Sequence, residues 1–134
     1  ACLQEDSSRP ALVFMHHPPF ITGMGAMDEP FEGADLLRDV LSRAPWARLC
    51  CGHMHRPIFT AWAQGLALTV PSISMQIDLD LSPEGGDTFR MEMPGYMLHH
   101  WDGSHLNSHV CQIPADVDFS GPHPFADSVN PVED

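Results

Sequence analysis

Cys50-Cys51-Gly52-His53-Met54-His55-Arg56-Pro57 is the stretch that decides the fold, because an apolar run ends there in a glycine and two histidines one residue apart. A second stretch, Met15-His16-His17-Pro18-Pro19, is built in the same way. In each of them a short apolar strand, residues 11–15 or 47–51, stops where the imidazoles begin. Neutral imidazole is the commonest protein ligand of metal ions. The two stretches together therefore predict part of a metal centre.

The segment between these stretches has the periodicity of an amphipathic helix. Within residues 33–43, four apolar side chains recur at helical spacing: Leu36, Leu37, Val40 and Leu41. A strand, a helix and a strand over about 40 residues have the size of a βαβ crossover, which makes the two strands parallel. Both histidine stretches then lie at one edge of the sheet, where open α/β sheets bind ligands.

Consecutive strands are expected after Pro57. Residues 57–63 and 66–70 flank the two-residue hairpin signal Gln64-Gly65. Residues 74–81 alternate Met75, Ile77, Leu79 and Leu81 with polar side chains, so one face of that strand is expected to be buried. Three more strands are expected at residues 89–93, 96–101 and 106–113, the first two on either side of Pro94-Gly95 and the third after a turn at Asp102-Gly103.

The two ends of the chain have a different character. Residues 1–10 read as the end of a preceding helix, and residues 114–134 as a proline-rich tail without periodicity. The expected fold class is α/β, in the form of a βαβ unit followed by mostly antiparallel strands.

The composition limits the possible partners. A formal charge of −12 with six basic residues argues against a long nucleic acid, because a phosphate backbone is held by Lys and Arg. A hydrophobic share of 43% indicates a globular chain. No run of about 18 apolar residues that could cross a membrane and no signal sequence is found, which favours the cytoplasm. Cys50 and Cys51 are expected to be buried, inert thiols, and a thiol-based site there is the weaker alternative.

The histidines differ in the roles that their surroundings allow. His16 is the better ligand of its pair because Pro18 rigidifies the backbone that follows, and His17 is then a group beside the metal or facing the substrate. Of His99 and His100, at most one points inward. Surface positions are expected for His105 and His109, and His123 is a poor ligand candidate. Three carboxylates could add ligands, Asp28, Asp78 and Asp80, although the last two are expected on a solvated strand face.

Four segments carry a resemblance to a known family. They are Val13-Phe14-Met15-His16-His17-Pro18-Pro19-Phe20 with Gly23, Met27 and Asp28, then residues 51–57, 94–99 and 121–125. Together they resemble the C-terminal half of a calcineurin-like metallophosphoesterase, and the likeness covers nearly the whole chain. Within that superfamily the chain is similar to the class III cyclic-nucleotide phosphodiesterases and their glycerophosphodiesterase relatives.

The resemblance implies a four-layer α/β/β/α sandwich with a site for two divalent or trivalent ions of Mn, Fe or Zn. Carried over to this sequence, His16 and His53 would hold one ion and His55 its partner, and His17 is the candidate catalytic residue. The family reaction is hydrolysis of a small phosphodiester, in which two ions clamp the phosphoryl oxygens for in-line displacement.

The sequence also departs from the family pattern. The motifs Asp-x-His, Gly-Asp and Gly-Asn-His-Asp or Glu are missing upstream of His16, and Met75 stands where relatives often have a histidine. We therefore expect a chain that lacks the N-terminal half of the domain, holds at most one metal weakly, is inactive alone and associates through its uncovered apolar face into a homo-oligomer. The alternative is a non-catalytic metal-binding or assembly module, for which the sequence shows no obvious fourth ligand.

Overall fold

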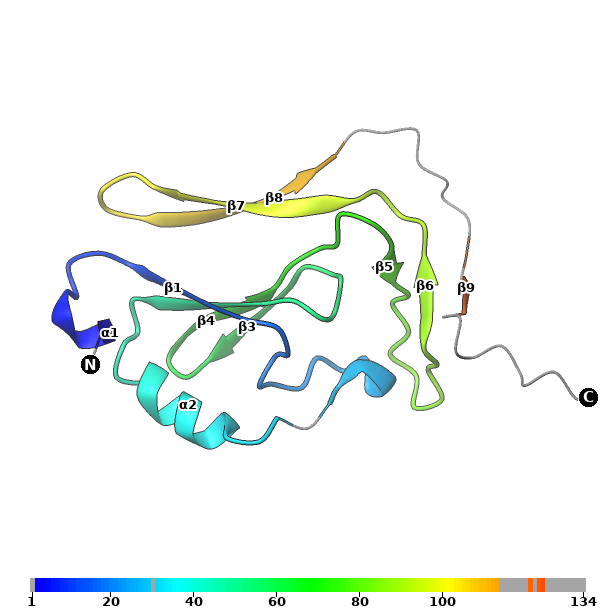
Figure 1. Ribbon diagram of the computed structural model, residues 1–134, viewed down its shortest axis with the longest axis horizontal. Helices are drawn as coiled ribbons and strands as arrows, with labels where there is room; N and C mark the ends of the chain where they lie inside the picture. Colours follow the sequence, from blue (N-terminus) through cyan, green and yellow to red (C-terminus); the bar gives the residue numbers. More distant parts are fainter. Residues whose placement is uncertain (1, 30, 114–120, 122, 125–134) are drawn as a thin grey trace, which may run out of the picture.

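Figure 1 shows a mixed α/β chain with many strands and few helices. The computed structural model describes residues 2–29, 31–113, 121 and 123–124. Along the chain the elements are α1 (Cys2–Glu5), β1 (Ala11–Met15), the short 3-10 helix η1 (Gly25–Met27), α2 (Ala34–Leu41), β2 (Ala47–Cys51), β3 (Ile58–Trp62), β4 (Gly65–Thr69), β5 (Gln76–Ile77), β6 (Thr88–Arg90), β7 (Gly95–Trp101), β8 (Leu106–Gln112) and β9 (His123–Pro124).

The expected βαβ unit is confirmed. β1 and β2 pair in parallel, with Ala11 opposite Ala47 and Met15 opposite Cys51, and α2 connects them. The sheet continues from β2 to β4 in parallel and from β4 to β3 in antiparallel orientation, which gives the order β1-β2-β4-β3. β1 and β2 therefore end at the same edge, as the sequence predicts.

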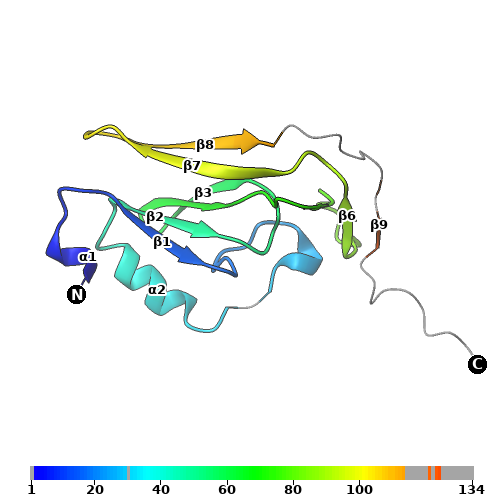
Figure 2. The same ribbon diagram turned by 45° about the horizontal axis from the view of Figure 1, so that its top comes forward.

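Three layers are visible among the described residues. α2 covers one face of the four-stranded sheet, where Leu37 and Leu41 pack in the core with Leu49 and Cys51. The β7–β8 hairpin lies over the other face (Figure 2). Arg48 of β2 joins these two sheets by donating hydrogen bonds to the Ser108 hydroxyl and to the Leu106 carbonyl of β8. The described residues thus form a mixed α/β arrangement in which one helix and one hairpin lie on opposite faces of the four-stranded sheet.

The hairpin between β3 and β4 is confirmed, but its turn lies one residue earlier than predicted. Trp62 pairs with Gly65, so the two turn residues are Ala63 and Gln64, with φ values of 51° and 64°. Positive φ at both central positions is the signature of a type I′ turn. Gly65 is required for another reason, because a Cβ there would lie 3.0 Å from the Ala47 carbonyl oxygen.

The expected strand over residues 74–81 is mostly wrong. Only β5 forms, and Leu79 and Leu81 are 58% and 64% exposed instead of buried. Gln76, predicted to be solvated, is 4% exposed. Its side-chain amide accepts a hydrogen bond from Ser72 N and donates one to Ser72 O. These polar contacts between the Gln76 side chain and the Ser72 backbone fix the segment, and an alternating apolar pattern does not reveal them.

The remaining elements agree only in part with the sequence analysis. The helix predicted over residues 33–43 forms, but Leu36 and Val40 of its apolar side are 73% and 47% exposed. The strand expected over residues 89–93 is shortened to β6, which pairs with β5 and β9. Most of the tail at 114–134 lies outside the described residues. In the described part of the chain, no helix is long and apolar enough to span a membrane.

The predicted burial of Cys50 and Cys51 is confirmed, with exposed fractions of 2% and 1%. Burial raises the pKa of the Cys50 thiol to about 11, although the nearby Arg48 guanidinium opposes the shift. Burial, with the neighbouring Cys50, raises the pKa of Cys51 to about 12. Thiols that stay protonated are poor nucleophiles, so this pair does not support a thiol-based site.

These two thiols predict how stability depends on alkaline pH. Their pKa values in the folded chain lie above the ordinary value of 9.0, so the unfolded chain releases protons first as the pH rises. The free energy of unfolding should therefore fall from about pH 9 to about pH 12. Urea unfolding at several pH values measures this, and the chain has no lysine to complicate that range. If the Cys50→Ala/Cys51→Ala variant kept the same slope, the thiols would not be its cause.

Candidate metal centre

Three imidazoles meet where β1 and β2 end. The ligand atoms of His16, His17 and His53 all lie within 4.8 Å of one another. The ring centroids of His17 and His53 are 4.3 Å apart, and those of His16 and His53 are 5.4 Å apart. The parallel register produces this meeting, because Met15 lies opposite Cys51, His16 follows β1 directly and His53 follows β2 after Gly52.

Gly52 makes room for the His16 ring. Its backbone N–H lies 2.9 Å from the His16 carbonyl oxygen and 3.2 Å from that of Met15, which joins the two chain segments directly after the strands. A Cβ at this position would lie 3.2 Å from His16 Nδ1, closer than side chains normally approach. The glycine of the Gly-His-x-His stretch is thus explained by a close approach to the other histidine stretch.

The backbone of the His-x-His loop is not extended. His53 and His55 have φ values of 65° and 51°, in the left-handed region that non-glycine residues rarely adopt. Met54 between them is fully buried, in a cluster with Met24 and Ile77. This anchor holds a loop conformation that would otherwise be strained.

His55 lies outside the group of three imidazoles among the described residues. Its Nδ1 is 3.2 Å from the Met75 carbonyl oxygen, and its own carbonyl accepts a hydrogen bond from Ser72 N. That contact occupies one ring nitrogen and leaves Nε2 as the nitrogen available to a ligand. Met75, noted as a departure from the family, thus contacts His55 through its backbone.

A loop of residues 18–29 lies next to the imidazoles. Asp28 shapes this loop, because its carboxylate accepts hydrogen bonds from the Thr22 N–H, the Thr22 hydroxyl and the Gly23 N–H, each at 2.8 Å. Asp28 is therefore engaged in the loop and is not among the grouped ligand atoms. The other two carboxylate candidates have partners elsewhere. Asp78 pairs with Arg90, and Asp80 accepts a hydrogen bond from Ser82 N.

Glu29 is the site residue that sequence reasoning missed. Its Oε2 lies 3.0 Å from His17 Nε2, and its Oε1 lies 4.0 Å from His53 Nε2. The Met27 carbonyl oxygen, two residues earlier, lies 3.2 Å from His53 Nε2. The only sequence signal was the acidic pair Asp28-Glu29, which follows the first histidine stretch.

The environment favours the neutral form of His53. Burial, followed by the neighbouring His17, lowers the pKa of its imidazole below the usual value, while Glu29 and the Met27 carbonyl act in the opposite direction. A neutral ring has a free lone pair for an ion. Three imidazole nitrogens with a carboxylate beside them form a donor set that suits Zn, Fe or Mn. The residues present therefore fit a metal ion of the expected kind.

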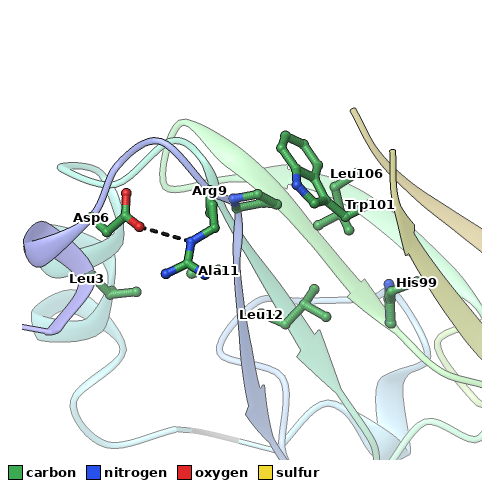
Figure 3. Close-up of a pocket in the computed structure, with 9 residues that line it drawn as sticks. Leu3, Asp6, Arg9, Ala11, Leu12, His99, Trp101 and Leu106 are labelled. Carbon is green, nitrogen blue, oxygen red and sulfur yellow. Dashed lines mark hydrogen bonds and ion pairs between the residues drawn. The ribbon is translucent and has the colours of Figure 1, made fainter. Parts of the chain in front are cut away.

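A cavity of about 500 Å³ lies at the opposite end of the strands. Figure 3 shows Leu12 of β1 facing Trp101 and Leu106 of the hairpin, with the Asp6–Arg9 ion pair of 2.9 Å at the rim. The histidine group follows the last residue of β1, whereas this cavity borders its first ones. The cavity is thus separate from the candidate metal centre.

The remaining histidines agree with the sequence analysis. His99 is partly buried, with Nδ1 at 2.6 Å from the Ser108 hydroxyl, and His100 is exposed. His105 and His109 are exposed, as expected. His123 lies in β9, with its ring centroid 5.5 Å from that of Phe89.

Curated proteins with known names match this chain. The probable glycerophosphodiester phosphodiesterase GpdQ of Arcobacter nitrofigilis is 35% identical over 92% of this chain and 45% of its own length. The probable cyclic nucleotide phosphodiesterase of Rhodopseudomonas palustris is 31% identical over 84% of this chain and 42% of its own length. The glycerophosphodiester phosphodiesterase GpdQ of Enterobacter lignolyticus is 31% identical over 77% of this chain and 37% of its own length.

These matches confirm the resemblance drawn from the motifs. The chain spans less than half the length of each of these relatives. No protein-family model matches it.

The contact between Gly52 and His16 gives a testable expectation. Gly52→Ala places a methyl group 3.2 Å from His16 Nδ1 and should displace that ring by a few tenths of an ångström. Zn²⁺ affinity, measured by calorimetry, should fall by about tenfold because ligand orientation matters at metal sites. Gly86→Ala is the matched control, since its methyl group would meet nothing within 4 Å. Equal affinities of the two variants would contradict the assigned role of Gly52.

Proposed function

We propose that this chain, a metallophosphoesterase-like segment related to glycerophosphodiester and cyclic nucleotide phosphodiesterases, takes part in the metal-dependent hydrolysis of small phosphodiesters. The observation that carries the proposal is the meeting of three imidazoles after two parallel strands. Sequence similarity and site geometry thus support the same class of chemistry.

In this proposal His16 and His53 hold one ion and His55 contributes to a second. Bound ions would supply Lewis acidity toward a phosphate ester. The Met27 carbonyl holds the His53 ring, and the Met75 carbonyl holds the His55 ring. Backbone acceptors of this kind fix which nitrogen of a ligating histidine carries the proton.

His17 is proposed as the catalytic residue of the complete site. Its ring lies against those of His16 and His53, and its side chain is 40% exposed. A substrate bound at the ions could therefore be reached by this ring. Its Nε2 donates to Glu29, which fixes the direction in which the ring points.

A small ester is the proposed substrate class. The formal charge of −12 disfavours a long polyanion, and the curated relatives are named for cyclic nucleotides and glycerophosphodiesters. Arg56, the arginine of the histidine loop, is already engaged, because it donates to the Ile77 carbonyl and pairs with Glu92 at 2.9 Å. The charge of a phosphate would therefore be met by metal ions and not by this side chain.

A second polypeptide surface is proposed beside β1. Among the described strands, β1 pairs only with β2, so its outer backbone edge has no strand partner there. Phe14 of β1 is 68% exposed, and Leu36 of α2 is 73% exposed. Apolar side chains beside an open edge favour pairing with another strand. We propose that the other half of the domain covers this edge in a longer protein, and a second copy in its absence.

A non-catalytic metal-binding module is the second candidate. This candidate is favoured because one short chain brings three imidazole ligands together without a contribution from other polypeptide. Such a module would bind an ion and show no turnover in any longer protein that contains it. The two candidates therefore differ in activity and not in metal binding.

The activity of the chain alone can be predicted. With bis(p-nitrophenyl) phosphate and Mn²⁺, the 134-residue chain should turn over at least about 100-fold more slowly than the Arcobacter relative, because it carries only part of a two-metal ligand set. A rate close to that of the relative would overturn the prediction. The longest reading frame containing this chain should be active and lose activity in His53→Ala. Inactivity of that protein would favour the non-catalytic module.

Association through the β1 edge can be tested by light scattering. The 134-residue chain should form dimers or larger species at high concentration, and Phe14→Ser should reduce their share because a 68% exposed ring is removed. Phe59→Ser is the matched control, since Phe59 is 50% exposed on β3 at the other edge of the sheet. A monomer at all concentrations would contradict this expectation.

A further inference from the structure

The Glu29 carboxylate and the Met27 carbonyl form an acceptor pair on the loop that lies next to the imidazoles. Glu29 Oε2 lies 3.0 Å from His17 Nε2, and the Met27 oxygen lies 3.2 Å from His53 Nε2. Both rings therefore present the same nitrogen to the loop. Because a carboxylate and a carbonyl oxygen can only accept, Nε2 is the nitrogen that donates in each hydrogen bond, and in the neutral ring Nδ1 keeps its lone pair.

The loop is built to hold these acceptors in place. The Glu29 backbone N–H donates to the Met27 carbonyl, which connects the two acceptors. Asp28 between them fastens the loop through Thr22 and Gly23. Met24 of the same loop packs on Met54, the buried residue that separates His53 from His55. The acceptors and the rings are thus positioned by one shared cluster.

Metal-binding histidines almost always donate their second ring N–H to a carboxylate or a backbone carbonyl. His17 and His53 have this arrangement, one with each type of acceptor. We infer that His17 is a third imidazole ligand of a single-metal site in this chain, that it binds through Nδ1 beside His16 and His53, and that Glu29 is its positioning residue. The inference rests on the proposed function in taking His16 and His53 as ligands.

The donor set decides what such a site would be. Three imidazoles and one open position are the arrangement of catalytic zinc sites, whereas structural sites are closed by four protein ligands. In a tetrahedral site with bonds of about 2.0–2.1 Å, neighbouring donors lie about 3.3 Å apart. One ring nitrogen of each histidine lies within 4.8 Å of one from each of the other two, a wider spacing than in a tetrahedral site, so binding requires the rings to move or rotate. The exposed His16 and the partly exposed His17 have space for such movements.

The experiment is a titration of the 134-residue chain with Zn²⁺ by calorimetry and with Co²⁺ by visible absorption. We expect one ion per chain. The dissociation constant should rise by more than tenfold in each of the variants His16→Ala, His17→Ala and His53→Ala. Loss of a hydrogen-bond partner of a ligand already costs about 10- to 100-fold in affinity, and loss of the ligand itself should cost more. His109→Ala, which removes an exposed imidazole on β8, is the control.

Glu29 has variants that separate positioning from charge. Glu29→Ala removes the acceptor and should weaken binding by about tenfold, while Glu29→Gln keeps an acceptor oxygen and should weaken it less. If Glu29→Gln and Glu29→Ala were equally weak, charge and not ring orientation would be responsible, and the positioning role would be wrong. Circular dichroism shows whether each variant is folded.

The outcomes separate this inference from the proposed function. If His17→Ala binds as the unaltered chain does while His16→Ala and His53→Ala fail, the inference is overturned and the proposed ligands stand. If none of the three substitutions changes affinity, both are wrong. Nitrogen NMR of the metal-free chain adds a test that needs no variant: His17 should carry its proton on Nε2, and a proton on Nδ1 would overturn the inference.

Discussion

The parallel register of β1 and β2 is the constraint on which the rest of the site depends. Met15 and Cys51 lie opposite each other, so His16 and His53 follow at the same edge of the sheet. A slip of one residue would turn every side chain to the other face and separate the two rings. The Gly52 N–H, which contacts the Met15 and His16 carbonyls, continues this pairing past the strand ends. The meeting of the imidazoles is therefore a property of the sheet and not of the loops alone.

The second constraint acts from the far side of the histidine loop. Left-handed backbone at His53 and His55 costs on the order of 1–2 kcal/mol per residue. Burial of Met54 against Met24 and Ile77 offsets this cost, and Arg56 ties the loop to the Ile77 carbonyl and to Glu92. The same hydrophobic cluster holds the loop that carries Glu29. Any change that loosens it should disturb ligands and acceptors together, which links a few buried methionines to the chemistry.

The sequence was sufficient for the parts of the fold that local periodicity determines. The strand, helix and strand around residues 11–51 and the shared edge of the histidines followed from hydrophobic spacing and chain topology. The segment at 74–81 did not, because the Gln76 amide contacts Ser72 and excludes the regular alternation. Glu29 was missed because no spacing rule connects a loop carboxylate with a strand-end imidazole such as His17. The left-handed backbone of His55 also has no signature in residue types.

Exposure determines what three imidazoles can do by themselves. The His17 and Glu29 side chains are 40% and 56% exposed, so water reaches both sides of their hydrogen bond. Water screens the attraction between the imidazole and the carboxylate, so an exposed pair interacts only weakly. The same contact in a site from which water is excluded orients the ring more firmly. Two-metal phosphoester chemistry depends on a shaped cavity that excludes water around the ions. The open edge of β1, which carries the exposed Phe14, runs directly into His16, so polypeptide that covered this edge would also shield the imidazoles. Covering the β1 edge would thus bury apolar surface and strengthen the metal centre in one step, which couples completion of the sheet to completion of the site.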